Sequence, residues 1–163
     1  MTDTYTLWKT AHIVSAAILF GTGLGIAFFS WFGYRRALAM GEMDGLRAVL
    51  RLTVIGDLCF TAPAVIFQFI SGLILMDINS WPLLSPWSVT VVGLFILVGF
   101  LWLPVVWIQV VMSREAERVQ SIENLSPGFH RRFTLWFVLG IPAFLLVLVL
   151  FFLMVAKPLA FAG

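Results

Sequence analysis

Residues 133–156 read FTLWFVLGIPAFLLVLVLFFLMVA, a run without one charged side chain. An α-helix needs about 20 mostly apolar residues to cross the roughly 30 Å hydrocarbon core of a bilayer. The run is long enough to do so, and an apolar run of this length is typical of a membrane span rather than of a buried helix in a soluble domain. This stretch therefore predicts a transmembrane helix and an integral membrane protein.

The rest of the chain has the same character. Of its 163 residues, 61% are hydrophobic and 11% are charged, and the mean hydropathy is +1.04, which excludes an ordinary soluble domain. The first apolar run has no cationic segment before it and is too long for a signal peptide, so we expect it to be retained. The sequence predicts a single domain over residues 1–163, an all-α polytopic four-helix bundle with spans at about 7–34, 52–76, 87–112 and 133–156.

The arginines indicate how the spans are oriented. The loop between Asp77 and Pro86 contains no Lys or Arg, whereas the other two loops are rich in arginine. Basic loops stay in the cytoplasm, so both the N- and C-termini are expected outside. Such charges usually form a solvated face that sets topology, and anionic lipid is their expected partner, with no sign of a nucleic-acid site. The loop arginines are Arg35, Arg36, Arg47 and Arg51, followed by Arg114, Arg118, Arg131 and Arg132.

His12 is the one histidine inside a predicted span. An ionisable residue within a membrane is costly, so it is a functional candidate by default. On a helix, Ala16, Leu19 and Gly23 share its face and Lys9 lies beside it, and the small residues leave space next to the imidazole. That space suits either a haem whose iron His12 ligates or a neighbouring helix to which a neutral His12 is hydrogen-bonded. Both interpretations remain open at this point.

Small residues and prolines predict how the helices pack. Gly21 and Gly25 form a small-xxx-small pair, which allows another helix to approach closely and implies no chemistry. Pro63, Pro104 and Pro142 place one potential kink in each of the last three spans, and kinks of this kind can open an internal cavity.

The second span carries a stripe of polar and small residues. Placing an unpaired polar atom in hydrocarbon costs roughly several kcal/mol of free energy. This face of the helix should therefore point away from lipid, toward the other helices or a water-filled cavity. Interhelical hydrogen bonding is the simpler explanation and is favoured for Thr61 and Ser71, whereas a functional role is favoured for Asp57 and Gln68. The stripe, which we call the polar stripe, comprises Asp57, Thr61, Ala64, Gln68 and Ser71.

The sequence contains no motif of the common metal-binding, redox or hydrolytic sites. Cys59 is the only cysteine, so there is no disulfide framework or CxxC motif, and no phosphate loop, zinc motif or nucleophile–base pair argues for a hydrolase. His130 belongs to the cytoplasmic end, which makes a haem held by both histidines of one chain improbable. Met76, Met154 and Lys157 are outer groups that could complete a coordination sphere, although each is more often a packing or anchoring residue.

Four short motifs spread over nearly the whole chain suggest a family. They are LWKTAHIV at 7–14, GTGLG at 21–25, FTAPA at 60–64 with Gln68 and Gly72 after it, and LMVAKP at 153–158. Together they resemble a bacterial family of small integral membrane proteins of unknown function. The lysine three residues before His12 and the Lys-Pro ending are also similar to the HemJ family of membrane protoporphyrinogen oxidases, and the first span is similar to CopD-like proteins.

The resemblance to HemJ implies a b-type haem with His12 as a ligand, and Lys9 and Lys157 match its basic positions. The chain departs from that family in two places, since no Asn-Glu precedes Pro142 and the other ligating histidine has no match.

We therefore expect a multi-pass protein of the bacterial inner membrane, with a homo-oligomer as one option, that holds b-type haem or porphyrin through His12. Electron transfer or porphyrin oxidation is the expected chemistry, with a membrane redox partner and an unidentified second axial ligand. The competing prediction is a cofactor-free small transporter or accessory subunit, in which the polar stripe lines a solute path or a partner interface. An absorption spectrum distinguishes the two.

Overall fold

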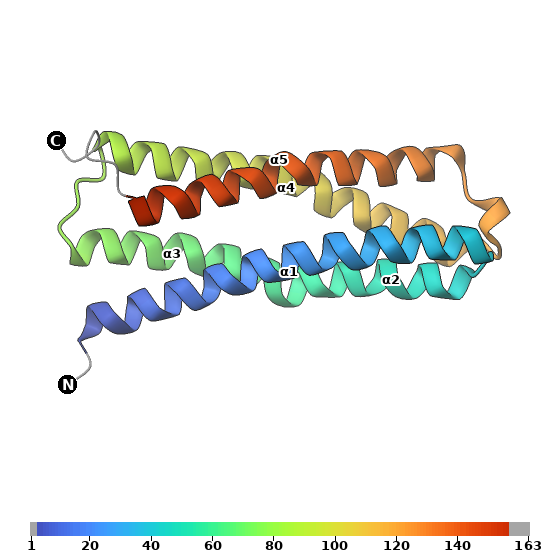
Figure 1. The fold of residues 1–163 in the computed structure, drawn as a ribbon, viewed down its shortest axis with the longest axis horizontal. Helices are drawn as coiled ribbons and strands as arrows, with labels where there is room; N and C mark the ends of the chain where they lie inside the picture. The colour runs from blue at the N-terminus through green and yellow to red at the C-terminus, as the bar shows by residue number, and fades with distance from the viewer. Residues whose placement is uncertain (1–2, 157–163) are drawn as a thin grey trace.

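The computed structural model describes residues 3–156, which are almost entirely helical (Figure 1). In chain order the elements are α1 (Thr4–Met40), α2 (Met43–Gly56), a π-helical turn η1 (Asp57–Thr61), α3 (Ala62–Ile78), α4 (Pro86–Arg118), a short 3-10 helix η2 (Ile122–Asn124) and α5 (Pro127–Ala156).

Within residues 3–156, four helical units are long and apolar enough to cross a membrane: α1, the continuous α2–η1–α3 segment, α4 and α5. The prediction of an all-α bundle with four spans is therefore confirmed. The helices exceed the predicted spans, since the 37 residues of α1 extend over about 55 Å at 1.5 Å per residue. In Figure 1, α1 begins and α5 ends at the same end of the molecule, which we call the terminal end.

The π-helical turn has a local cause. Pro63 has no backbone N–H and cannot donate to the carbonyl of Cys59, so one regular helical hydrogen bond is missing at this point. The backbone N–H of Ala62 instead reaches the carbonyl of Asp57, five residues back. One of the three predicted kinks thus takes the form of a π turn, a feature often found at functional sites. Helices α4 and α5 continue as helices through Pro104 and Pro142.

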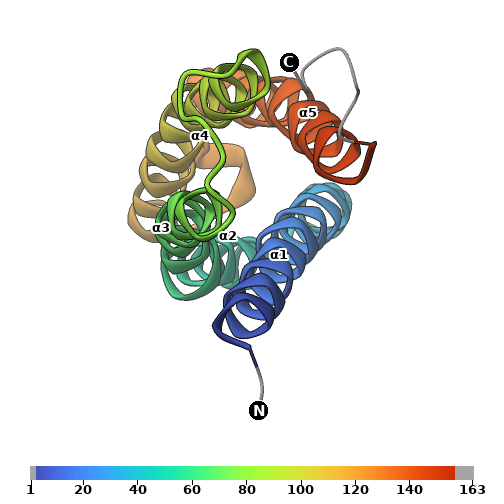
Figure 2. The same ribbon diagram turned by 90° about the vertical axis from the view of Figure 1, so that its left-hand side faces the viewer.

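The helices pack most tightly at the other end, which we call the arginine-rich end. There α1, α2, α4 and α5 share a core that includes Leu46, Met112 and Phe129. The terminal end has a smaller core around Trp87, Val91 and Leu150. Viewed from the terminal end, the helices are arranged in an arc from α1 through α2, α3 and α4 to α5 (Figure 2), and α1 also contacts α5 through the stacked rings of Phe20 and Phe144. The larger cluster of buried residues therefore lies at the arginine-rich end.

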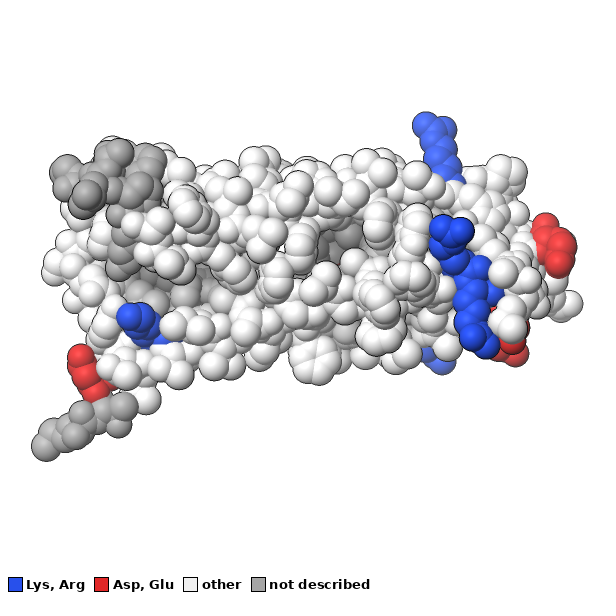
Figure 3. Space-filling view, viewed as in Figure 1, with Lys and Arg blue, Asp and Glu red and all other residues white. Residues whose placement is uncertain are grey.

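The basic residues gather at the arginine-rich end, where most of the blue surface in Figure 3 lies. Two of them have structural roles that the sequence did not reveal. Arg47 donates to the carbonyls of Ala116 and Val119 at 3.0 and 2.5 Å, which satisfies the end of α4, and Arg132 forms an ion pair with Glu115. The arginines that are exposed are Arg35, Arg36, Arg51, Arg114, Arg118 and Arg131.

Candidate functional site

The polar stripe is buried along its whole length. Helix α3 and the π turn direct it toward α1 and α4, as expected for a face that cannot meet lipid. The exposed fractions of its residues are 6% for Asp57, 5% for Thr61, 6% for Ala64, 8% for Gln68 and 0% for Ser71. This burial agrees with the sequence-based expectation for the face, whereas the roles of the single residues stay predictions.

His12 meets the stripe near the terminal end. Its Nδ1 lies 2.7 Å from the Ser71 hydroxyl oxygen, and that hydroxyl lies 2.6 Å from the carbonyl of Phe67. The amide of Gln68 donates to the backbone carbonyl of His12 at 2.9 Å. Gly72 lies beside the ring: a methyl group there would lie 3.6 Å from His12 Cε1, an ordinary van der Waals distance. We call His12, Gln68, Ser71 and Gly72 the His12 site.

The residues predicted to surround His12 are only partly brought together. Ala16 is half-buried, and a methyl group added at Gly23 would meet no other helix or side chain within 4 Å; a space for a cofactor beside His12 stays a prediction. Lys9 is exposed, and its ammonium lies 5.5 Å from the centre of the Tyr5 ring. Lys157 lies outside the described residues.

The glycine pair predicted as a packing device has no partner within the described part of the chain. Gly21 and Gly25 would each accept a methyl group with no atom of residues 3–156 within 4 Å. The close helix contacts are made elsewhere on α1 and α2: at Gly33, where a methyl group would lie 2.6 Å from Val49, and at Gly56, where it would lie 3.2 Å from Ile26. The sequence pattern alone could not show which of these glycines contact another helix.

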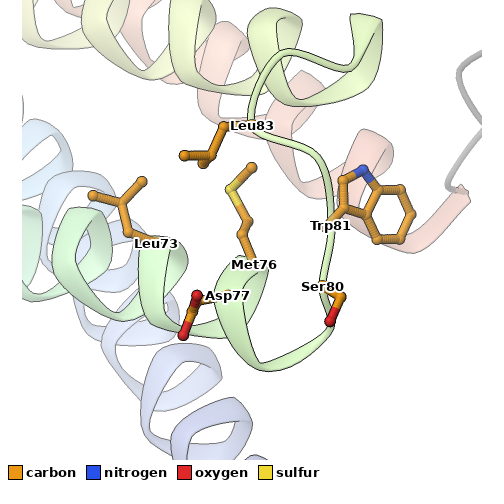
Figure 4. Close-up of a pocket in the computed structure, with 6 residues that line it drawn as sticks. All are labelled: Leu73, Met76, Asp77, Ser80, Trp81 and Leu83. Carbon is orange, nitrogen blue, oxygen red and sulfur yellow. The ribbon is translucent and has the colours of Figure 1, made fainter.

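A cavity of about 390 Å³ lies at the terminal end, between α3 and the loop that follows it (Figure 4). Met76 extends into it beside Leu73 and Leu83, while Asp77 and Ser80 lie at its edge. His12 is not among its lining residues, so Met76 and His12 do not share this cavity. Figure 3 also shows the surface hollowed between α1 and α5 near the middle of the molecule.

A second polar cluster surrounds Asp57 in the π turn. The amide nitrogen of Gln109 on α4 donates to Asp57 Oδ2, and the indole N–H of Trp136 on α5 donates to Gln109 Oε1 at 3.0 Å. Trp102 and Thr61 adjoin the same carboxyl group, although the buried Thr61 hydroxyl has no partner at normal hydrogen-bond geometry. We call these five residues the Asp57 cluster.

Sequence reasoning identified Asp57 but missed Gln109 and Trp136. Gln109 could have been found, since it is a lone amide in a long apolar span and such residues usually face another helix. Two more interhelical hydrogen bonds were missed, Ser30 with Thr53 at 2.7 Å and Tyr34 with His130 at 2.6 Å. Within residues 3–156, no three His, Cys, Asp or Glu side chains come together as a metal site would require.

Comparison with known protein families places the chain among the predicted integral membrane proteins of the DUF2269 family, which it matches over residues 6–158. Because the match covers nearly the whole chain, the protein belongs to this family. Neither curated proteins nor solved structures gave a significant match.

Proposed function

We propose that this member of the DUF2269 family binds a b-type haem or a related porphyrin through Nε2 of His12, with a role in electron transfer or porphyrin oxidation. The observation that carries the proposal is the hydrogen bond between His12 and Ser71. As an enzyme it would be a membrane oxidoreductase of the porphyrin-oxidising type.

The tautomer of His12 follows from the Ser71 hydroxyl. That hydroxyl has one hydrogen, and the carbonyl of Phe67 can only accept, so the hydrogen goes to Phe67. Ser71 Oγ must then accept a hydrogen bond from the N–H group at Nδ1 of His12. Nε2 is left with a free lone pair, and it makes no hydrogen bond to any residue from 3 to 156. A histidine held through Nδ1–H with Nε2 free has the form that metal-ligating histidines take.

The neighbouring residues fit such a group in their chemistry. Gly72 and Ala16 are small, the space at Gly23 is open, and exposed Lys9 is available for a propionate at the terminal end. His12 is the one residue of the described chain that would hold the iron of such a group. A bound haem would supply reversible one-electron exchange; the chain's own part is to orient the imidazole through Ser71 and to fix α1 against α3 through Gln68.

The same proposal includes orientation and location. By the positive-inside rule, the arginine-rich end faces the cytoplasm of a bacterial inner membrane and the His12 site lies in the outer leaflet. Exposed arginines such as Arg35 and Arg131 would contact anionic lipid. A membrane redox partner, or a second copy of the chain, would meet the outer half of the bundle.

An absorption spectrum tests the proposal. Protein purified in mild detergent from haem-replete cells should show a Soret band that shifts on reduction. His12→Ala should lose or strongly alter the band, whereas the matched variant His130→Ala should keep it. Gly23→Leu, which fills the open space, should lower haem occupancy, and Ser71→Ala should keep haem but shift its reduction potential, because Nδ1 loses its acceptor.

A colourless wild-type protein that also fails to take up added haemin would exclude the cofactor. The alternative is then a cofactor-free accessory subunit or small transporter. Two observations favour the subunit: Gly21 and Gly25 present a small-residue face that nothing in residues 3–156 covers, and the stripe is closed by bonds such as that from Ser15 to the carbonyl of Ala64 at 3.2 Å.

A further inference from the structure

Asp57 is a carboxyl group buried inside the membrane-crossing part of the protein. It lies five residues into the predicted span that begins at Leu52, or about 8 Å along the helix axis, and its residue is 6% exposed. A carboxylate in such a place is costly unless it is paired or neutralised. The proposed haem site does not use this residue.

The hydrogen bonds around Asp57 all point toward it. An indole N–H can only donate, so Trp136 forces the oxygen of the Gln109 amide to face α5. The amide nitrogen must then face Asp57, to which it donates. The Trp102 indole adjoins the same carboxyl group. The Gln109 N–H stabilises the ionised form of Asp57, and the bond from Trp136 fixes how the Gln109 amide is oriented.

No Lys or Arg of residues 3–156 forms an ion pair with that ionised form. Within residues 3–156 the two ion pairs are Arg47 with Asp44 and Arg132 with Glu115, both at the arginine-rich end. Cys59, the other titratable residue of the π turn, is exposed. The side chains beside the Asp57 carboxyl are Thr61 of the π turn and Trp102 and Gln109 of α4, and none of them carries a charge.

Thr61 provides what the protonated form needs. Its hydroxyl lies one helical turn from Asp57, is buried and has no partner at normal geometry. If Asp57 is ionised, Thr61 can donate to it; if Asp57 is protonated, Thr61 can accept from it. In either protonation state of Asp57, the Thr61 hydroxyl would gain a hydrogen-bond partner that it otherwise lacks. The site is therefore arranged for both protonation states, with donors favouring one and the lack of a counter-charge favouring the other.

We propose that Asp57, with Thr61 and Gln109, forms a reversible proton-binding site within the membrane. A small metal cation would instead require several oxygen ligands, whereas Gln109 presents an N–H group to the carboxylate. The proposal is independent of haem binding, since no residue of the His12 site takes part.

Labelling with a hydrophobic carbodiimide tests the proposal. The reagent adds to a protonated carboxyl group in an apolar environment and gives a stable N-acylurea, so dicyclohexylcarbodiimide should modify Asp57 in the intact protein in proteoliposomes. Peptide mass mapping should place the label on Asp57, and its rate should fall as the pH rises between about 5 and 9. A water-soluble carbodiimide should modify exposed Asp77 instead.

Matched variants sharpen the test. Asp57→Asn should abolish the label, and Asp77→Asn should leave it intact. Thr61→Val, which cannot accept the carboxylic proton or donate to the carboxylate, should move the pH of half-maximal labelling, whereas Thr61→Ser should restore it. Difference infrared spectra of the same samples should show a protonated-acid carbonyl band that disappears with rising pH in the wild type and is missing in Asp57→Asn.

Two results would overturn the proposal in folded protein. One is the lack of any label on Asp57 across that pH range, with no protonated-acid band. The other is a label and a band of constant strength at every pH, which would mean that Asp57 is permanently protonated. Because neither measurement depends on colour, the outcome is separate from that of the haem test.

Discussion

The Tyr34 hydroxyl lies 2.6 Å from Nδ1 of His130, and this hydrogen bond joins α1 to the first turns of α5 at the arginine-rich end. The Tyr34 ring also stacks on Phe133, with ring centres 3.7 Å apart. His130 is thus a partner of α1 in the folded bundle, far along the helix axis from the His12 site.

Removing the Tyr34 hydroxyl should weaken the bundle without disturbing this stacking. Tyr34→Phe and His130→Ala should each lower the free energy of unfolding by about 1 kcal/mol. The double variant should lose less free energy of unfolding than the two single variants added together, because both single variants remove the same hydrogen bond. Chemical unfolding in mixed micelles measures this, with lipid-facing Phe32→Leu as a control that should have little effect. Additive effects would show that the bond contributes nothing.

The close contact between α1 and α2 predicts opposite effects for two glycines of the same helix. Gly33→Ala should destabilise the protein by about 1–3 kcal/mol, because the new methyl group would lie 2.6 Å from Val49. Gly23→Ala should be neutral or slightly stabilising, since it meets nothing within 4 Å. Thermal unfolding in detergent measures both. Val49→Ala should rescue Gly33→Ala, and a failure of rescue would argue against this contact.

Asp57 and Gln109 should behave as a coupled pair. Asp57→Leu leaves the buried Gln109 amide without its acceptor and should cost about 1–3 kcal/mol. Adding Gln109→Leu should recover part of that loss, because no unpaired amide then faces the new leucine, although Trp136 still lacks an acceptor. Yield and thermal stability measure the effect. Improved stability of Asp57→Leu alone, with unchanged function, would remove Asp57 from the candidate residues.

The arginine distribution makes a prediction about topology. Reporter fusions at Gly45 and Gly128 should report a cytoplasmic location, and a fusion at Asn79 an external one, because the loop around Asn79 has no basic residue. A cytoplasmic signal at Asn79 would reverse the orientation and place the His12 site in the inner leaflet.

Much of the fold could be predicted because hydrophobic length and helical geometry act locally. The four spans follow from runs such as residues 133–156, and the burial of Asp57, Gln68 and Ser71 on one face follows from their spacing at 100° per residue. The glycine motif was less informative, because Gly21 and Gly33 look alike in sequence while only Gly33 meets another helix within the described residues.

By itself, the sequence determined the class of protein, the number of spans and the face of α3 that avoids lipid. Only the tertiary structure decided which residues meet, such as His12 with Ser71, and Gln109 with Asp57, 52 positions away. The physical reason is that lipid is as apolar as a protein core, so the two sides of a membrane helix carry little contrast. Helix pairing then depends on shape and on a few polar partners, which become neighbours only when the chain has folded.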